Sequence, residues 1–210
     1  MADAKAVGVQ ALLGAARRLR ARAKRSRAGL PPLLFLTDPR RTPDPARAAE
    51  RLPSGCGLVF RAFGATDALA VGRRLREIAD ARGLVLLVGA DEALAQAIGA
   101  DGVHLPERLV HRAGPIRRRH SRWIVTAAAH GRAGLVAAAR AGADAVLLSP
   151  AFESASPSAG RPLGPARFAT LARTARVPVY ALGGVNMKTA PRLLGSGAAG
   201  LAAIGALIRT

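Results

Sequence analysis

His130 is the residue of this chain best suited to proton transfer. It ends the apolar run that begins at Ile124, and an imidazole can both accept and donate a proton near neutral pH. The alternative is a histidine that only caps a nearby loop. His104 lies inside a shorter apolar run, so it either lines a pocket or is a satisfied core residue. His111 and His120 lie among arginines and are expected at the surface, and no histidine spacing indicates a metal site.

Two apolar runs end in glycine, which predicts a phosphate site. Gly183 and Gly184 close the first run, and Gly205 lies near the end of the second. Glycine turns leave backbone N–H groups uncovered, and a helix start beside them carries a partial positive charge that suits phosphate. Asn186 is the expected N-cap of that helix, over residues 187–194. The alternative is that both turns only close buried strands.

The elements that must position these residues alternate regularly from residue 33 onward. Short apolar runs, each followed by a helix-forming segment, predict eight strands. Because the runs are apolar throughout, they indicate parallel strands buried on both faces. Eight such units close best as a single (β/α)8 TIM barrel of the α/β class, whose functional face lies at the carboxyl ends of the strands. The predicted strands lie at 33–37, 57–61, 84–88, 103–105, 124–128, 145–149, 179–182 and 200–206.

Residues 1–30 are predicted as an extra, basic N-terminal helix or extension that precedes a barrel domain over 31–210. The segment 9–27 is rich in alanine, leucine and arginine and contains no acidic residue, which favours an amphipathic helix. Its cationic cluster is similar to those of transit peptides and membrane-surface helices. We favour a helix packed along or beneath the barrel, since the segment lacks the long apolar core of a secretory signal.

Composition and charge narrow the classes of function. The chain has 210 residues, half of them hydrophobic, and a formal net charge of +19. Such a charge is typical of nucleic-acid binding, but the arginines are scattered and only 3% of the residues are aromatic. We therefore expect a solvated basic surface that attracts anionic substrates, with no nucleic acid as the main partner. A single Cys56 excludes an intramolecular disulfide, no apolar run is long enough to span a bilayer, and a cytoplasmic location is expected.

A glycine-led motif repeats where helix ends meet strand starts, at 99–103, 142–146 and 197–201. Glycine as a helix C-cap explains its first position. Because the motif precedes each strand, it lies at the face of the barrel opposite the functional one. Asp101 and Asp144, the third residues of the first two copies, are therefore predicted to be structural.

Six segments follow one another as an ordered set: Leu36-Thr37-Asp38, Gly99 to Leu105, His130, Gly142 to Phe152, Pro162-Leu163-Gly164 and Val177 to Gly184. In this order they resemble thiamine phosphate synthase and its relative, the TenI-type thiazole tautomerase. The likeness covers about residues 33–206 and implies a TIM barrel of thiamine biosynthesis that binds a thiazole phosphate. In the synthase, this thiazole attacks an aminopyrimidine diphosphate and releases pyrophosphate with the help of magnesium.

The resemblance also implies roles for single residues. It matches His130 to a histidine held by both branches, which in a tautomerase moves a proton on and off the thiazole ring. Together with the glycine turns, it implies a phosphate site made by Gly183, Gly184, Ile204, Gly205, Ser154, Ser156 and Gly164.

The residues for the second substrate are where the chain departs from the synthase. Of the synthase pattern Gln-Leu-Arg-Glu-Lys at the end of strand two, only Arg61 is present. The magnesium-binding aspartate after strand three is replaced by Gly89-Ala90, which leaves Asp91 one position beyond it. Glu107 is at best a displaced substitute for the second acidic ligand, and the loop lysine falls on Pro157. A leaving pyrophosphate needs a metal or cationic groups to neutralise its charge.

We therefore expect an enzyme of thiamine biosynthesis that is closer to the tautomerase than to the synthase. The synthase is the nearest alternative, and a non-catalytic barrel that binds a thiazole or thiamine phosphate is another. No cofactor is expected unless the protein is a synthase, which would use Mg²⁺. The expected partner is the small-molecule thiazole phosphate, and the sequence is compatible with a homo-oligomer.

Overall fold

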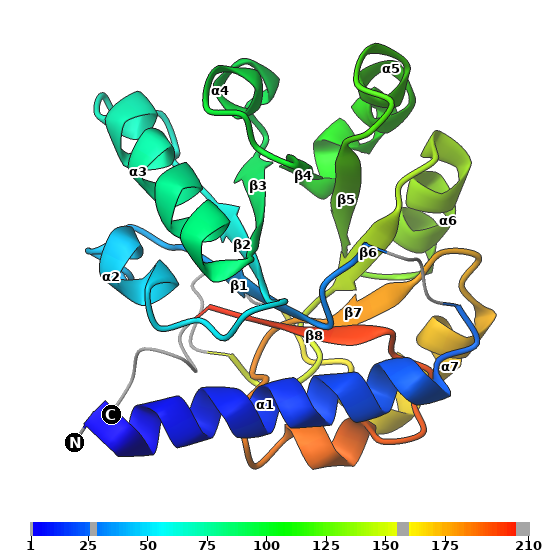
Figure 1. Ribbon diagram of the computed structural model, residues 1–210. Helices are drawn as coiled ribbons and strands as arrows, with labels where there is room; N and C mark the ends of the chain where they lie inside the picture. The colour runs from blue at the N-terminus through cyan, green and yellow to red at the C-terminus, as the bar shows by residue number, and fades with distance from the viewer. Residues whose placement is uncertain (1, 26–28, 155–159, 205–210) are drawn as a thin grey trace.

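Eight parallel strands form a closed barrel in the order β1-β2-β3-β4-β5-β6-β7-β8, in which β8 pairs with β1. The computed structural model describes residues 2–25, 29–154 and 160–204. Helices surround the strands, and α1 lies alongside β8 (Figure 1). The predicted (β/α)8 barrel with an N-terminal helix is therefore confirmed.

All eight strands start within one residue of the predicted positions. They are β1 (Leu33–Leu36), β2 (Gly57–Phe60), β3 (Val85–Gly89), β4 (Gly102–Leu105), β5 (Ile124–Ala129), β6 (Ala145–Leu148), β7 (Val179–Ala181) and β8 (Gly200–Ala203). The helices are α1 (Ala2–Arg22), α2 (Pro45–Ala49), α3 (Ala68–Arg82), α4 (Glu92–Ala97), α5 (Ala113–Arg119), α6 (Arg132–Ala141) and α7 (Gly164–Thr174). Two 3-10 helices complete the described elements, η1 (Glu107–Arg112) and η2 (Ala190–Leu193).

Strand side chains point alternately into and out of the barrel, which produces two apolar clusters. The inner cluster includes Leu34, Leu87 and Tyr180, and the larger outer cluster lies between the strands and the helices. The Tyr180 hydroxyl donates to the Pro31 carbonyl at 2.7 Å. A Cβ at Gly200 would lie 2.3 Å from the Tyr180 ring, so this glycine makes room for the ring inside the barrel.

The N-terminal helix contributes its apolar side to the outer cluster. Val9, Leu12, Leu13 and Leu19 of α1 are buried, and the helix contacts β8, β1 and η2. This packing agrees with the expectation of a helix that flanks the barrel. None of the helices in the described part of the chain has the length and apolar character that a membrane span requires.

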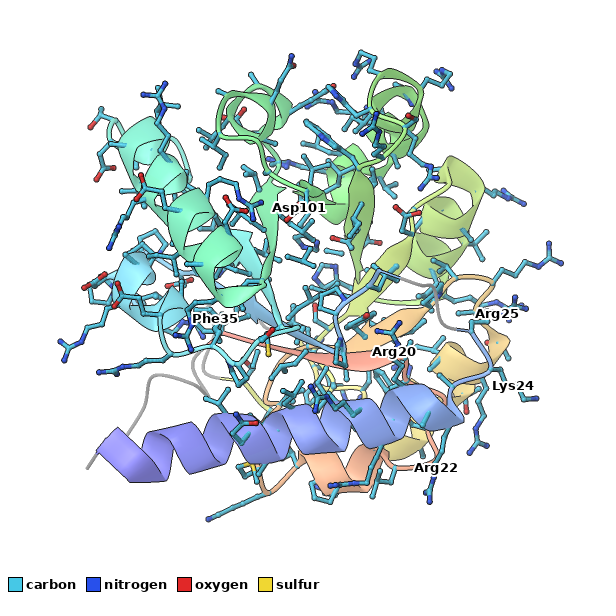
Figure 2. The ribbon with its side chains drawn as sticks, viewed as in Figure 1. Arg20, Arg22, Lys24, Arg25, Phe35 and Asp101 are labelled. Atoms are coloured by element: carbon cyan, nitrogen blue, oxygen red, sulfur yellow. The ribbon has the colours of Figure 1, made fainter. Side chains whose placement is uncertain are left out.

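The basic end of α1 is held against the barrel by backbone carbonyls. Figure 2 shows Arg20, Arg22, Lys24 and Arg25 gathered where the helix ends. Arg20 and Arg25 each donate to a backbone carbonyl of another segment, Arg25 at 3.0 Å. These two cations therefore fix the end of the helix.

In two copies of the glycine-led motif, the aspartate makes the same pair of contacts, one to a strand N–H and one to an arginine. Asp101 Oδ2 accepts the backbone N–H of the second residue of β3 at 2.7 Å and an N–H of Arg76 at 3.0 Å. Asp144 Oδ2 accepts the N–H of the second residue of β5 at 2.8 Å, and Asp144 also pairs with Arg117. Each aspartate ties the start of a strand to the preceding helix, which confirms the structural role predicted for both.

The segment after β7 differs from the helix predicted over 187–194. The Asn186 side-chain oxygen accepts two backbone N–H groups of the following turn, at 2.8 and 3.1 Å. The Thr189 hydroxyl donates to the Gly184 carbonyl at 2.8 Å. Because these local side-chain bonds replace helical backbone bonds, only the short η2 forms. The expected contribution of an α-helix start to a phosphate site beside Gly184 is therefore wrong.

Candidate functional site

The carboxyl ends of the strands open into a cavity of about 1150 Å³. This is the face that the barrel fold predicts to be functional. Every strand, or the segment directly after it, supplies lining residues. Examples in strand order are Leu36, Arg61, Gly89, His104, Ala128, Ser149, Leu182 and Ile204.

The glycine turn after β7 has backbone N–H groups beside this cavity that lack an acceptor in the described part of the chain. Gly183 and Gly184 have φ angles of 88° and 65°, and neither N–H has an acceptor within the described residues. A Cβ would lie 2.9 Å from Pro150 Cα at Gly183 and 2.2 Å from the Glu153 carbonyl oxygen at Gly184. The turn therefore packs tightly on the loop after β6. Gly183 lines the cavity, whereas Gly184 packs against Phe152 and Glu153 of that loop.

The other residues of the predicted phosphate site fall into three groups. Ser154 and Ile204 line the cavity beside Gly183. Gly164 starts α7 instead, and its N–H donates to a backbone carbonyl of the loop after β6 at 3.0 Å, so this donor is engaged within the fold. Ser156 and Gly205 lie outside the described residues.

Arg61 is fixed on the cavity wall by the end of β1. Its backbone N–H donates to Thr37 Oγ1 at 2.9 Å and its Nε donates to the Thr37 carbonyl at 2.6 Å. One Nη donates to Asp38 Oδ2 at 3.2 Å. A Cβ at Gly89 would lie 3.0 Å from Arg61 Cγ, so the absence of a side chain at this position leaves room for the Arg61 side chain. Burial lowers the pKa of Arg61 and Asp38 opposes the shift; the guanidinium stays charged.

His130 forms a pair with Glu107 at the cavity rim. Its Nδ1 lies 2.5 Å from Glu107 Oε2, and the same oxygen accepts the His130 backbone N–H at 3.0 Å. The His130 side chain is 58% exposed and lines the cavity. A carboxylate that accepts Nδ1–H leaves Nε2 as a proton acceptor. The pair can therefore take a proton from a bound ligand and return it.

His104 lies deeper in the barrel and lines the same cavity. It is 7% exposed, and its Nδ1 lies 3.0 Å from Thr126 Oγ1. Burial, with a smaller contribution from the positive charge of Arg61, lowers the pKa of His104 to about 4. The imidazole is therefore neutral at pH 7, and both roles left open by the sequence apply to it.

The acidic residues near the cavity do not fit a magnesium site. Asp91 Oδ1 accepts the Leu94 N–H at 2.8 Å and caps α4. Glu107 is engaged by His130, and Glu92 contacts two arginines and the His120 imidazole. Within the described residues, no three His, Cys, Asp or Glu side chains are grouped to hold a metal. Mg²⁺ is usually held by one or two carboxylates together with water and substrate phosphates. The carboxylates near this cavity are already engaged in a helix cap and in ion pairs, so they do not match the ion that the resemblance implies.

A group of basic side chains that the sequence pattern did not reveal extends the cavity between α4 and α5. Arg108, Arg112, Arg119 and His120 line this part. Arg119 makes a bidentate pair with Glu92, with both N–O distances at 2.8 Å, and Arg112 reaches the same carboxylate at 3.2 Å. The signal in the sequence is the run of basic residues that follows the fourth strand.

Two aromatic side chains of the cavity carry further information. His120 stacks on Trp123 at a centroid distance of 3.7 Å, and its side chain is 18% exposed. It is therefore partly exposed, at the wall of the cavity, rather than fully at the surface. Phe63 is 68% exposed and has a φ of 50°, which costs a bulky residue about 1 kcal/mol or more. Strained positions cluster at ligand sites. Phe63 is therefore a candidate to contact a flat ring.

Known proteins share both the sequence pattern and the barrel. The family model described as thiamine monophosphate synthase matches residues 33–207. A relative from Geobacter sulfurreducens, named "Putative thiamine-phosphate synthase", is 36% identical over 141 residues, which cover 67% of this chain and 66%, just under two thirds, of the relative. The protein named thiamine-phosphate synthase of Alcanivorax borkumensis is 33% identical over 190 residues, which cover 83% and 84%.

A solved structure gives the same architecture. Thiamine phosphate pyrophosphorylase from Pyrococcus furiosus superposes with a TM-score of 0.69 at 23% identity, covering 82% of this chain and 84% of that one. At this identity the likeness shows the barrel fold alone. The family match, in contrast, runs from the start of β1 to beyond the end of β8. The chain therefore belongs to the thiamine monophosphate synthase family.

Proposed function

We propose that the protein is a thiamine phosphate synthase, which joins a thiazole phosphate to an aminopyrimidine diphosphate and releases pyrophosphate. The observation that carries the proposal is one cavity with a bare glycine turn on one wall and arginine side chains on the opposite wall. In a closed barrel of eight strands, β2, β3 and β4 lie opposite β6, β7 and β8. The names of the relatives from Geobacter sulfurreducens and Alcanivorax borkumensis support the same activity. The missing diphosphate and magnesium residues of the sequence favoured the tautomerase, and we reverse that preference here.

The wall from β6 to β8 suits the monophosphate of the thiazole. It presents the bare N–H of Gly183, the polar side chain of Ser154 and the end of β8 at Ile204. Backbone N–H groups and hydroxyls can donate hydrogen bonds to the phosphate oxygens.

The wall from β2 to β4 suits the leaving group. In the reaction the thiazole nitrogen forms a bond to the methylene carbon of the pyrimidine. The bond from that carbon to the diphosphate oxygen breaks, and pyrophosphate leaves with the electron pair. Cationic side chains that contact this group stabilise its developing charge. Arg61, held by Thr37 and Asp38, is preorganised for that role.

The direct test is to incubate the purified chain with both substrates and to measure thiamine phosphate and pyrophosphate by chromatography. We expect the two products in equal amounts, and a loss of about tenfold or more in Arg61→Gln. Arg118→Gln is the matched control, because Arg118 is an exposed arginine of α5 that does not line the cavity. Absence of both products, with thiazole phosphate bound, would refute the synthase proposal.

The His130–Glu107 pair favours a second candidate, the thiazole tautomerase. Here Nε2 of His130 would take a proton from the thiazole ring and return it at another position, while Glu107 holds the imidazole. Exchange of ring hydrogen for deuterium in D₂O, lost in His130→Ala, would support this activity. Calorimetric binding of thiazole phosphate without product formation and without exchange would instead indicate the non-catalytic barrel.

A further inference from the structure

Building on the proposed synthase activity, we propose that Arg108 and Arg112 bind the diphosphate of the second substrate together with Arg61. In this arrangement the arginines supply the positive charge that magnesium supplies in the family that the sequence resembles. Glu92 and Arg119 hold Arg112 in position.

The two arginines line the same cavity as Ala90, which stands at a position where the resemblance places a carboxylate that binds the metal. Ala90 replaces the aspartate after β3, and its N–H donates to the His104 carbonyl at 2.9 Å, which sets it beside the end of β4. Two residues after β4 ends, η1 begins and brings Arg108 and Arg112 to the same cavity. Arginine side chains of the protein therefore line the part of the cavity in which the synthase has carboxylates that bind a magnesium ion.

The ion pairs of this group leave positive charge available. Arg119 neutralises Glu92 through a bidentate contact, and hydrogen bonding by Arg119 lowers the pKa of Glu92, so the carboxylate stays ionised. Arg112 reaches the same carboxylate through one Nη at 3.2 Å, which orients its guanidinium and leaves other N–H groups for a ligand. Arg108 forms no ion pair among the residues that the structure describes.

This surplus matches the charge and shape of a diphosphate. Three arginines and one glutamate give the group a net charge of two positive units, before Arg61 and its partner Asp38 are counted. The planar fork of a guanidinium binds two phosphate oxygens at once. Charge stabilisation of a leaving group needs fixed cations close to it and does not depend on their being metal ions.

The test is a calorimetric titration of the full chain with inorganic pyrophosphate, once in EDTA and once in Mg²⁺. We expect binding in EDTA with an affinity that Mg²⁺ changes by less than about threefold. The Arg108→Gln/Arg112→Gln variant should bind about tenfold more weakly or worse, since it loses hydrogen bonds to a charged group. Arg118→Gln should bind as the wild type does, and thiazole phosphate affinity should be unchanged in all variants, which reports an intact fold. Arg108→Gln alone, at an exposed side chain, serves if the double variant is unstable.

Pyrophosphate binding that needs Mg²⁺, or equal affinity in the double variant and the wild type, would overturn the arginine site. The outcomes also separate this inference from the synthase proposal. Metal-free pyrophosphate binding that depends on the two arginines, without formation of thiamine phosphate, would keep the site and refute the synthase. Synthase turnover that requires Mg²⁺ and is unaffected by the double substitution would refute the arginine site alone.

Discussion

His130 Nδ1 lies 2.5 Å from Glu107 Oε2, and the same carboxylate oxygen accepts the backbone N–H of His130. This double contact fixes the direction of the imidazole and favours the tautomer with the proton on Nδ1. Glu107 was a weak magnesium candidate from the sequence, and the structure gives it a partner that explains its position differently.

Substitution Glu107→Gln should weaken proton transfer by His130. The neutral amide no longer stabilises the imidazolium that forms when Nε2 takes a proton, so deuterium exchange into the thiazole should slow by roughly tenfold or more. Nitrogen-15 NMR should report a smaller population of the Nδ1-protonated tautomer, while thiazole phosphate affinity stays within about twofold of the wild type. An unchanged tautomer population would show that Glu107 does not control the imidazole.

Substitution Gly134→Ala, in α6, should disrupt the pair between His130 and Glu107. A Cβ at Gly134 would lie 2.4 Å from Glu107 Oε1 and 2.9 Å from Ala129 Cβ, so the carboxylate and the helix must both move. The overpacking outweighs the gain in helix propensity, and we expect a net loss of about 1 kcal/mol in the free energy of unfolding. Gly131→Ala is the control, because no atom of the described residues beyond its chain neighbours lies within 4 Å of the added Cβ. A wild-type tautomer population in Gly134→Ala would contradict the close packing.

The buried His104 should make the fold sensitive to acid. Its pKa is about 4 in the fold and about 6.5 in the unfolded chain, so between these values the unfolded state binds more protons. Stabilisation by neutral His104 is fully present above pH 6.5 and is lost as the pH falls towards 4. Between pH 7 and pH 4.5 the wild type should lose about 2 kcal/mol more unfolding free energy than His104→Gln. Urea denaturation of both proteins at both pH values measures this difference, and equal losses would show that His104 is not buried in its neutral form.

The sequence predicted the barrel because its strands are apolar throughout, and this pattern can be recognised without knowledge of tertiary contacts. It failed at Asn186, where side-chain hydrogen bonds to a turn compete with a helix and short-range pattern does not decide between them. It also singled out Arg61 and His130, which directly follow strands and line the cavity; their roles stay predictions. It missed Arg112 and Arg119, because their position depends on how η1 and α5 fold back towards Glu92, and a basic run in a basic protein carries little signal of its own.

The two aspartates of the repeated motif should differ in their effect on stability. Asp144 has a side chain that is 3% exposed, whereas that of Asp101 is 42% exposed. Asp144→Ala leaves a buried backbone N–H and Arg117 without their acceptor and should cost about 3 kcal/mol. Asp101→Ala should cost about 1 kcal/mol, because water can replace the exposed carboxylate. Urea denaturation gives both values. A larger loss of stability for Asp101→Ala would contradict the argument that the more buried aspartate contributes more.

Substitution Gly184→Ala tests whether the glycine turn binds phosphate. Gly184 and Gly195 both have positive φ angles, of 65° and 79°, so alanine costs about 1 kcal/mol of backbone strain at either position. At Gly184 the Cβ would also meet the Glu153 carbonyl oxygen, at 2.2 Å. At Gly195 the part of the chain that the structure describes places no such atom within 4 Å. The loop after β6 must therefore move in Gly184→Ala, and it carries Ser154 away from Gly183.

Calorimetry should then show thiazole phosphate affinity reduced by about tenfold or more in Gly184→Ala, because hydrogen bonds to a charged phosphate are lost. The affinity of Gly195→Ala should match that of the wild type. If both variants weaken binding equally, the effect comes from general destabilisation and the turn is only the end of a buried strand. If neither does, the phosphate is held elsewhere in the cavity, and Arg61 after β2 and the arginines of η1 become its candidate cationic partners.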